Sequence, residues 1–245
     1  MIDTKWIQTE YWFSFCQNYC NLIFFPSSLL LIVSLFFGLF IAPVDFQQGD
    51  VYRIIFVHVP CAAVSLCFYS FVGLCSLLYI TSRINLFDIM ALSFAKVGVI
   101  FTFLSLFTGA IWGQPTWGTY WVWDARLTSQ LLLLGIYVAY ISGRGCSNPS
   151  KQLKIYMSVF AVMGLVDLPI IHFSVNWWQT LHQPPSLFKF AYPSIAPEIL
   201  WILMYSLISF FAIAFSFFLL TLRTELFVYC EHKRWLKKCL ESAIV

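Results

Sequence analysis

Little of this sequence is charged. Asp, Glu, Lys and Arg make up 10% of its 245 residues, whereas soluble domains are normally about 25% charged. A net charge of +3, with the basic residues scattered along the chain, gives no basis for a nucleic-acid partner. Hydrophobic residues make up 60% of the chain. This composition excludes an ordinary soluble domain and indicates an integral protein of a lipid bilayer.

Several catalytic signatures are absent as well. There is no Walker loop, no GxGxxG, no HExxH and no GxSxG in a strand-turn-helix context, which argues against nucleotide hydrolysis and hydrolase chemistry. Eight cysteines occur without a CxxC or CxxCH motif, so neither a thiol oxidoreductase nor covalent heme attachment is indicated. We expect these cysteines to be free thiols and the chain to have no enzymatic turnover of its own.

Long apolar runs are abundant. About 20 apolar residues suffice for a helix to cross the hydrocarbon core of a bilayer. The sequence predicts six such spans, at about 22–43, 56–80, 89–111, 127–143, 153–172 and 196–221. We therefore expect an all-α integral membrane protein that forms a single membrane domain over residues 1–245, without linkers or internal repeats.

Basic residues are distributed unevenly between the two ends of these spans. The end that holds both termini and the loops 81–88 and 142–153 carries ten of the fourteen Lys and Arg residues. The opposite end carries only Arg53, Arg126 and Lys189. The positive-inside rule then places both termini inside. The loops 112–126 and 173–195 are expected to face the periplasm of a bacterial inner membrane or, alternatively, the intermembrane space of a mitochondrion.

The outer loop 112–126 concentrates large aromatic rings. Such a cluster can form a flat apolar surface that suits a planar ligand such as a porphyrin. An ordinary interfacial belt of aromatic residues is the alternative, but belt residues come singly and need no Gly113, Pro115 and Gly118 to shape the backbone. The candidate platform comprises Trp112, Trp117, Tyr120, Trp121 and Trp123, with Trp177 and Trp178 from the next outer loop.

Three of the four histidines, His58, His172 and His182, map to the outer end of the predicted spans. His58 lies where the second span begins, and His182 follows the Trp177 and Trp178 pair by a few residues. Two neutral imidazoles that approach from opposite sides could supply both axial ligands to a heme iron. A hydrogen-bonded interfacial histidine is the alternative for each of them, and His172 is a third candidate ligand.

The few charged residues allow two interpretations each. Arg53, Arg126 and Lys189 are the full positive charges available for heme propionates. Arg126 could instead pair with Asp124, and Arg53 could contact lipid headgroups. Lys96 and Asp167 lie well inside predicted spans, and we interpret Lys96 as snorkelling toward the interface and Asp167 as capping a helix rather than as a direct pair.

Three segments resemble one known family. Residues 112–126 (WGQPTWGTYWVWDAR) resemble the tryptophan-rich WWD signature of heme-handling membrane proteins of cytochrome c biogenesis. Residues 57–60 (VHVP) and 174–184 (SVNWWQTLHQP) further resemble the heme exporter protein C family of the system I cytochrome c maturation machinery. The similarity covers nearly the whole chain and includes all three motifs in the same order.

This resemblance implies that His58 and His182 are the axial ligands of a heme b. It also implies that the WWD loop, including Asp124, forms the platform beside the porphyrin. A member of this family binds heme at the outer face and delivers it to the membrane-anchored heme chaperone, CcmE. The implied partners also include the small single-span subunit CcmD and the ABC transporter subunits CcmA and CcmB.

Two other functions stay open at this stage. A b-type redox subunit that oxidises a quinol would pair histidines within the spans, whereas the histidines here lie at one end. A permease that carries heme across the bilayer would need polar or ligating groups at intermediate depth, where the sequence offers only Lys96 and Asp167.

Overall fold

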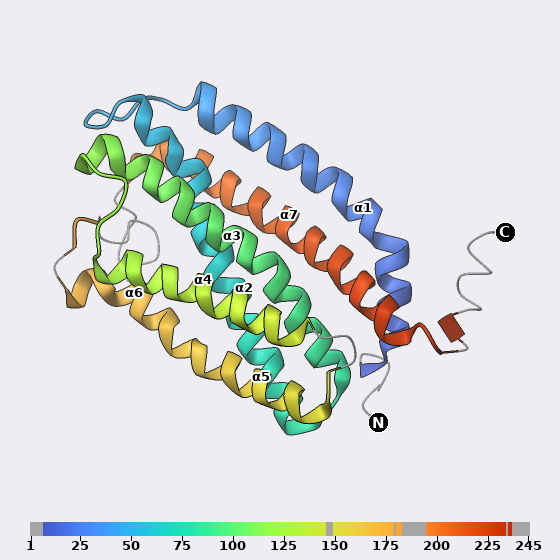
Figure 1. Ribbon diagram of the computed structural model, residues 1–245. Coiled ribbons are helices and arrows are strands. Elements are labelled where there is room, and N and C mark those ends of the chain that lie inside the picture. The colour runs from blue at the N-terminus through green and yellow to red at the C-terminus, as the bar shows by residue number, and fades with distance from the viewer. Residues whose placement is uncertain (1–6, 146–148, 179, 183–194, 234, 237–245) are drawn as a thin grey trace.

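The computed structural model describes residues 7–145, 149–178, 180–182, 195–233 and 235–236, and the described residues form helices without a strand (Figure 1). Six helical segments within them are long and apolar enough to cross a membrane, which confirms the expected class. The α-helices are α1 (Thr9–Phe36), α2 (Ile55–Ser82), α3 (Asn85–Trp117), α4 (Ala125–Arg144), α5 (Lys151–Met163), α6 (Asp167–Trp177) and α7 (Pro197–Cys230). Shorter turns are η2 (Phe37–Ile41), η3 (Asp50–Ile54) and η4 (Gly164–Val166), and η4 joins α5 to α6 in one span.

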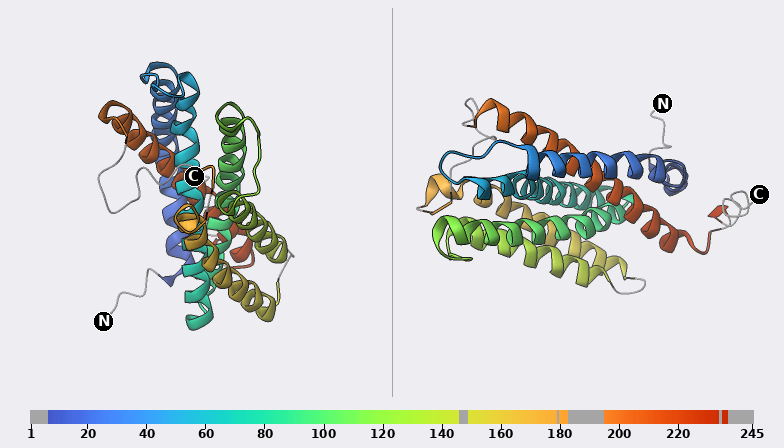
Figure 2. Two further views of the ribbon diagram at one scale, coloured as in Figure 1. Left: turned by 90° about the vertical axis from the view of Figure 1, so that its left-hand side faces the viewer. Right: turned by 90° about the horizontal axis from the view of Figure 1, so that it is seen from above.

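Helix α1 begins and helix α7 ends at the same end of the bundle, which we call the terminal end (Figure 1). The connections 42–49 and 118–124, with residues 178 and 180–182, lie at the opposite end, which we call the loop end (Figure 1). Helices α2 and α3 are joined by a short turn and pack against each other along their length. Helix α7 packs between α1 and α3, and it is inclined to α1 (Figure 2). This arrangement brings the ends of α2, α3, α4 and α6 together at the loop end.

Several helices extend further than the apolar runs indicate, α7 through Cys230 among them. Helix α1 begins at Thr9 rather than near residue 22, and this added part buries Phe13, Cys16 and Cys20 against the bundle. Helix α3 continues through Trp117, and α6 through Trp177. The first half of the segment 112–126 and the start of 173–195 are therefore helical rather than loop. Their hydrogen-bonded turns continue beyond the apolar stretch on which the expectation was based.

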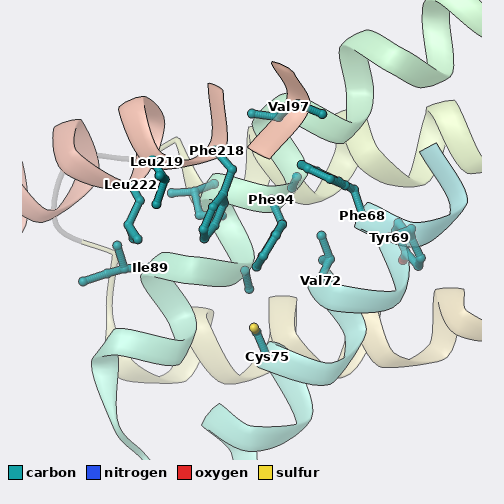
Figure 3. Packing of buried hydrophobic residues seen from close by; sticks show 14 of the residues in the cluster. Phe68, Tyr69, Val72, Cys75, Ile89, Phe94, Val97, Phe218, Leu219 and Leu222 are labelled. Carbon is teal, nitrogen blue, oxygen red and sulfur yellow. The ribbon is translucent and has the colours of Figure 1, made fainter. Parts of the chain in front are cut away.

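The centre of the bundle is filled by interlocking aromatic and aliphatic side chains from α2, α3 and α7 (Figure 3). The Phe94 and Phe218 rings stack with their centroids 3.9 Å apart. Because lipid tails are as apolar as these side chains, close packing rather than transfer from water holds such helices together. The cysteines within the described residues are free thiols, as expected: Cys16, Cys20, Cys61, Cys67, Cys75 and Cys230.

Buried polar contacts fix the helices relative to one another. Gln130 on α4 donates hydrogen bonds to the hydroxyls of Ser65 on α2 and Ser105 on α3, at 3.2 and 3.0 Å. At the terminal end, Asp88 on α3 pairs with Arg144 at 2.6 Å and with Lys154 at 3.2 Å. An unsatisfied polar group is costly inside a membrane protein, so these contacts hold α2, α3, α4 and α5 in register.

The two ionisable residues singled out inside the spans behave differently from the expectation. Lys96 forms an ion pair with Glu225 on α7 instead of reaching the interface alone. Asp167 lies in the first turn of α6, and its Oδ2 is buried without a hydrogen-bond partner among the described residues. The sequence interpretation missed the first contact because Glu225 belongs to the extension of α7 beyond the predicted span, where it faces Lys96.

Candidate functional site

A cavity of about 650 Å³ lies at the loop end between α2, α3, α4, α6 and α7. Small-molecule sites in proteins typically have volumes of about 300–1,000 Å³. Its deeper wall is apolar, with Ala62, Ala63 and Leu66 from α2 facing Leu106 and Ala110 from α3. Polar lining residues gather toward the loops, and Ser105 and Gln130 add polar groups deeper in the cavity. This cavity therefore has the size and the mixed lining expected of a site for a largely apolar molecule with a few polar groups.

His58 and His182 meet at this cavity from different parts of the chain. Their ring centroids are 6.5 Å apart and the rings are inclined by 36°. His58 comes from the first turns of α2, and His182 from the segment that follows α6. Two imidazoles on opposite sides of one metal ion, each with a metal–nitrogen bond of about 2.0 Å, place their centroids roughly 6 Å apart. The two rings are thus separated by about the distance that shared axial ligation requires.

His58 is held against α3 by two neighbours. Its Nδ1 lies 3.1 Å from the hydroxyl of Thr108. Gly109 provides the space for the ring, because a Cβ at that position would lie 2.9 Å from His58 Cε1. The edge of the Trp112 indole packs on the imidazole with the centroids 5.7 Å apart, and Trp112 Nε1 donates to Gln48 Oε1 at 2.8 Å. The imidazole is therefore positioned by residues some 50 positions away along the chain.

Asp124 connects the segment of His182 to the start of α4. One carboxylate oxygen accepts a hydrogen bond from the backbone N–H of Leu127 at 2.8 Å, which caps the helix. The other oxygen accepts from the Thr180 hydroxyl. The backbone N–H of His182 in turn donates to the Thr180 oxygen at 3.1 Å. Asp124 therefore acts through Thr180 on the placement of His182, and it does not line the cavity.

Arg126 lines the cavity and contacts two of the histidines. Its NH1 lies 3.0 Å from His182 Nδ1, and its NH2 donates to the backbone carbonyl of His172 at 3.1 Å. The ion pair between Arg126 and Asp124 that the sequence allowed is not formed in the described structure, because Asp124 is engaged by Leu127 and Thr180. His172 also lines the cavity, with its ring against Phe173.

The other two candidate cations lie elsewhere. Arg53 donates to the backbone carbonyls of Leu39 and Ala42, at 3.1 and 2.8 Å, and it does not line the cavity. Its guanidinium provides hydrogen-bond donors for the backbone carbonyls at the end of the first span, which is a common role for arginine near a helix C-terminus. Lys189 lies outside the described residues. Among the described residues that line the cavity, Arg126 is the one that carries a full positive charge.

The predicted aromatic platform divides into two groups. Trp112, Trp117 and Trp121 line the cavity, and the Trp117 ring lies 6.0 Å from that of His182. Trp121 Nε1 is buried without a hydrogen-bond partner. The remaining rings are more than half exposed at the loop end and do not line the cavity, namely Tyr120, Trp123, Trp177 and Trp178.

Gly118 explains how the chain turns between Trp117 and Trp121. It follows the last residue of α3 with φ of 76°, a left-handed conformation that favours glycine. Its N–H donates to the carbonyl of Gln114 at 3.0 Å and so ends the helix. Trp112 and Trp117 are consequently fixed on helical turns, whereas Trp121 and Trp123 follow the turn.

The comparison with known proteins identifies the family. The family model described as heme exporter protein C matches residues 3–237. Heme exporter protein C of Haemophilus influenzae is 36% identical over 242 residues, which cover 97% of this chain and 98% of the relative. The chain belongs to the heme exporter protein C family. A CcmC-like mitochondrial protein of cytochrome c biosynthesis from Marchantia polymorpha is 42% identical over 194 residues, covering 79% of this chain and 82% of the relative.

A further member of the heme exporter protein C family, from Bradyrhizobium diazoefficiens, is 39% identical over 199 residues, covering 80% of this chain and 75% of the relative. Together with the six apolar helices, these relatives show a multi-pass protein of the inner membrane. The mitochondrial relative is consistent with the alternative compartment considered above.

Sequence reasoning missed several residues of the cavity. Thr108 and Gly109 support His58, Gln48 holds Trp112, and Gln130 lines the deeper part. Gly109 carried a weak signal as a small residue in a bulky apolar run. The others gave none, because their roles depend on how α2, α3 and α4 face one another.

Proposed function

We propose that this chain takes up heme at the loop end and passes it to the heme chaperone CcmE during the biogenesis of c-type cytochromes. The names of the relatives, heme exporter protein C and a protein of cytochrome c biosynthesis, support a role in heme handling. One observation carries the proposal at the level of residues. The imidazoles of His58 and His182 face the same cavity with their centroids 6.5 Å apart, between Trp112 and Trp117.

The residues present fit a heme b. His58 and His182 would supply the two axial nitrogens, and the apolar wall of Ala62, Ala63 and Leu66 would contact the porphyrin body. Arg126 would hold a propionate, since a guanidinium matches a carboxylate in charge and in geometry. The uneven distribution of basic residues supports a periplasmic or intermembrane-space location for the loop end.

The same arrangement supports transfer rather than storage. His182 lies on a segment between helices rather than within a span, so exchange of this ligand would not require a membrane-spanning helix to shift. The exposed rings of Trp123 and Trp177 offer a contact surface for a membrane-anchored chaperone. CcmD, CcmA and CcmB are the further partners that membership of this machinery suggests. In this proposal the chain is a transfer subunit and not an enzyme.

A heme permease is the second candidate, and the depth of the cavity favours it. The lining on α2 extends from Ile55 to Cys67, which corresponds to about 18 Å along the helix axis. Gln130 and Ser105 add polar groups at that depth. A b-type redox subunit lacks such support, because no histidine within the described part of the spans other than His58 and His172 is available for ligation.

The heme-binding part of the proposal is tested by titrating the purified full chain, in lipid nanodiscs, with hemin. We expect His58→Ala and His182→Ala each to lose most of the heme affinity and the histidine-ligated absorption spectrum. His172→Ala is the matched control, because it removes an imidazole from the same cavity, and it should retain both. Full heme binding by the first two variants, or loss confined to His172→Ala, would overturn the assignment.

The transfer part needs a separate experiment. The heme-loaded chain is mixed with the soluble heme-accepting domain of the chaperone, and the heme content of each protein is measured after separation. The proposal predicts that heme leaves the chain and is recovered on the chaperone domain. Heme that stays on the chain would favour a redox subunit, and transport of heme into the lumen of vesicles containing this chain alone would favour a permease.

A further inference from the structure

His58 and His182 differ in which ring nitrogen carries the proton. Thr108 donates its single hydroxyl hydrogen to the carbonyl of Leu104 at 2.7 Å. Its oxygen therefore accepts from His58 Nδ1 across the 3.1 Å contact, so Nδ1 carries a proton. In a neutral imidazole the other nitrogen, Nε2, then has a lone pair. His58 is held in the tautomer that can bind a metal through Nε2.

His182 has the opposite arrangement. A guanidinium has five N–H donors and no acceptor. The 3.0 Å contact between Arg126 NH1 and His182 Nδ1 is therefore a hydrogen bond only if Nδ1 accepts. A neutral His182 then carries its proton on Nε2, and that nitrogen has no lone pair for a metal. The geometry of 6.5 Å between the rings suits axial ligation, but the tautomer of His182 does not.

Arg126 is also suited to bind a carboxylate that enters the cavity. It lines the cavity, its Nε is buried without a hydrogen-bond partner, and its NH2 is anchored on the carbonyl of His172. A carboxylate that engages the NH1 and NH2 groups of Arg126 together competes directly with the neutral Nδ1 of His182 for NH1. Charge-assisted hydrogen bonds are about twice as strong as neutral ones.

We propose that Arg126 is a positioning residue that keeps His182 unable to bind iron until a carboxylate of the porphyrin engages the guanidinium. When Arg126 turns to the carboxylate, His182 Nδ1 loses its donor. The proton on Nε2 passes through water to Nδ1, the net charge of the imidazole is unchanged, and the Nε2 lone pair becomes available to the iron. This inference rests on the proposed heme-binding function and adds an order to it: His58 ligates first, and His182 only after a carboxylate is bound.

The consequence for transfer is that the second ligand is conditional. Withdrawal of the carboxylate by an acceptor returns Arg126 to His182 and weakens that iron–nitrogen bond. Porphyrins without carboxylates are expected to bind through His58 alone. The site thus selects an iron porphyrin by its carboxylates as well as by its iron.

The test compares hemin with iron(III) octaethylporphyrin, which has the ring and the iron but no carboxylate. In the full chain in nanodiscs we expect hemin to become six-coordinate and low-spin, and the carboxylate-free porphyrin to become five-coordinate. In Arg126→Met, which cannot donate to His182, the carboxylate-free porphyrin should become six-coordinate. Arg53→Met is the matched control, since Arg53 lies at the same end but outside the cavity, and it should behave like the wild type.

A six-coordinate carboxylate-free porphyrin in the wild type would overturn this inference and leave the heme-binding proposal intact. Hemin that is ligated by neither His58 nor His182 would instead overturn the proposed function.

A measurement on the wild type covers the case in which Arg126→Met does not fold. Nitrogen-15 spectra of the histidine-labelled protein without heme should show His58 protonated on Nδ1 and His182 protonated on Nε2. Metal-free protoporphyrin IX should shift His182 to the Nδ1 form, and protonated Nδ1 on His182 before its addition would contradict the inference.

Discussion

Replacement of Gly109 by alanine tests how closely His58 must be placed. The added Cβ would lie 2.9 Å from His58 Cε1 and 3.4 Å from His58 Nδ1. Carbon atoms pack best at separations of about 3.5–4.0 Å, so the ring has to withdraw by about 0.6 Å or more. Metal–ligand distances tolerate deviations of only about 0.2 Å. Because a comparable loss of ligand support typically lowers metal affinity about 10- to 100-fold, we expect a decrease of that size in hemin affinity.

The fold should tolerate the change, because the overlapping atom belongs to a side chain that can turn. We expect the loss of stability to stay within the overpacking range of about 1–3 kcal/mol. The assay is a hemin titration of the purified protein, with the thermal midpoint of the heme-free protein measured alongside. Gly135→Ala is the control, since a Cβ added at Gly135 would meet no atom within 4 Å apart from its own helix backbone, and hemin binding should not change. Wild-type hemin affinity in Gly109→Ala would refute the reasoning.

Three further predictions use other parts of the structure. Trp121→Ala should lower heme occupancy of the purified chain more than Trp123→Ala, because only Trp121 lines the cavity; equal effects in a pyridine hemochrome assay would contradict this division. Thr180→Val should reduce hemin affinity without loss of membrane insertion, since it removes the hydroxyl between Asp124 and the His182 segment, and an unchanged titration would argue against that role. Asp88→Ala leaves buried cations unpaired at the terminal end and should destabilise the fold by about 3–5 kcal/mol in thermal unfolding, with hemin affinity of the folded fraction preserved.

The helical class and the count of spans follow from the sequence because both depend on local composition. A run of about 20 apolar residues is sufficient to indicate a span. Helix ends were less well predicted, since α3 continues through Trp117 on hydrogen bonds that apolarity does not report. The left-handed turn at Gly118 was the local feature that marks this end.

At the site, the sequence indicated the residues that carry chemistry but not how they are arranged. His58, His182 and Arg126 are recognisable by residue type, by their place at the outer end and by the motifs around them. Their hydrogen bonds join different helices, so the Thr108 contact of His58 and the Arg126 contact of His182 could not be read from local pattern. The same limit explains why the exposed and cavity-lining tryptophans could not be separated.

The coordination of the iron tests the central claim most directly. The ferric heme-loaded chain is examined by resonance Raman spectroscopy, which reports spin state and coordination number. The account predicts six-coordinate low-spin iron in the wild type and in His172→Ala, and five-coordinate iron in His58→Ala and in His182→Ala. A wild-type iron that is five-coordinate, or six-coordinate low-spin iron that persists in both single variants, would contradict it.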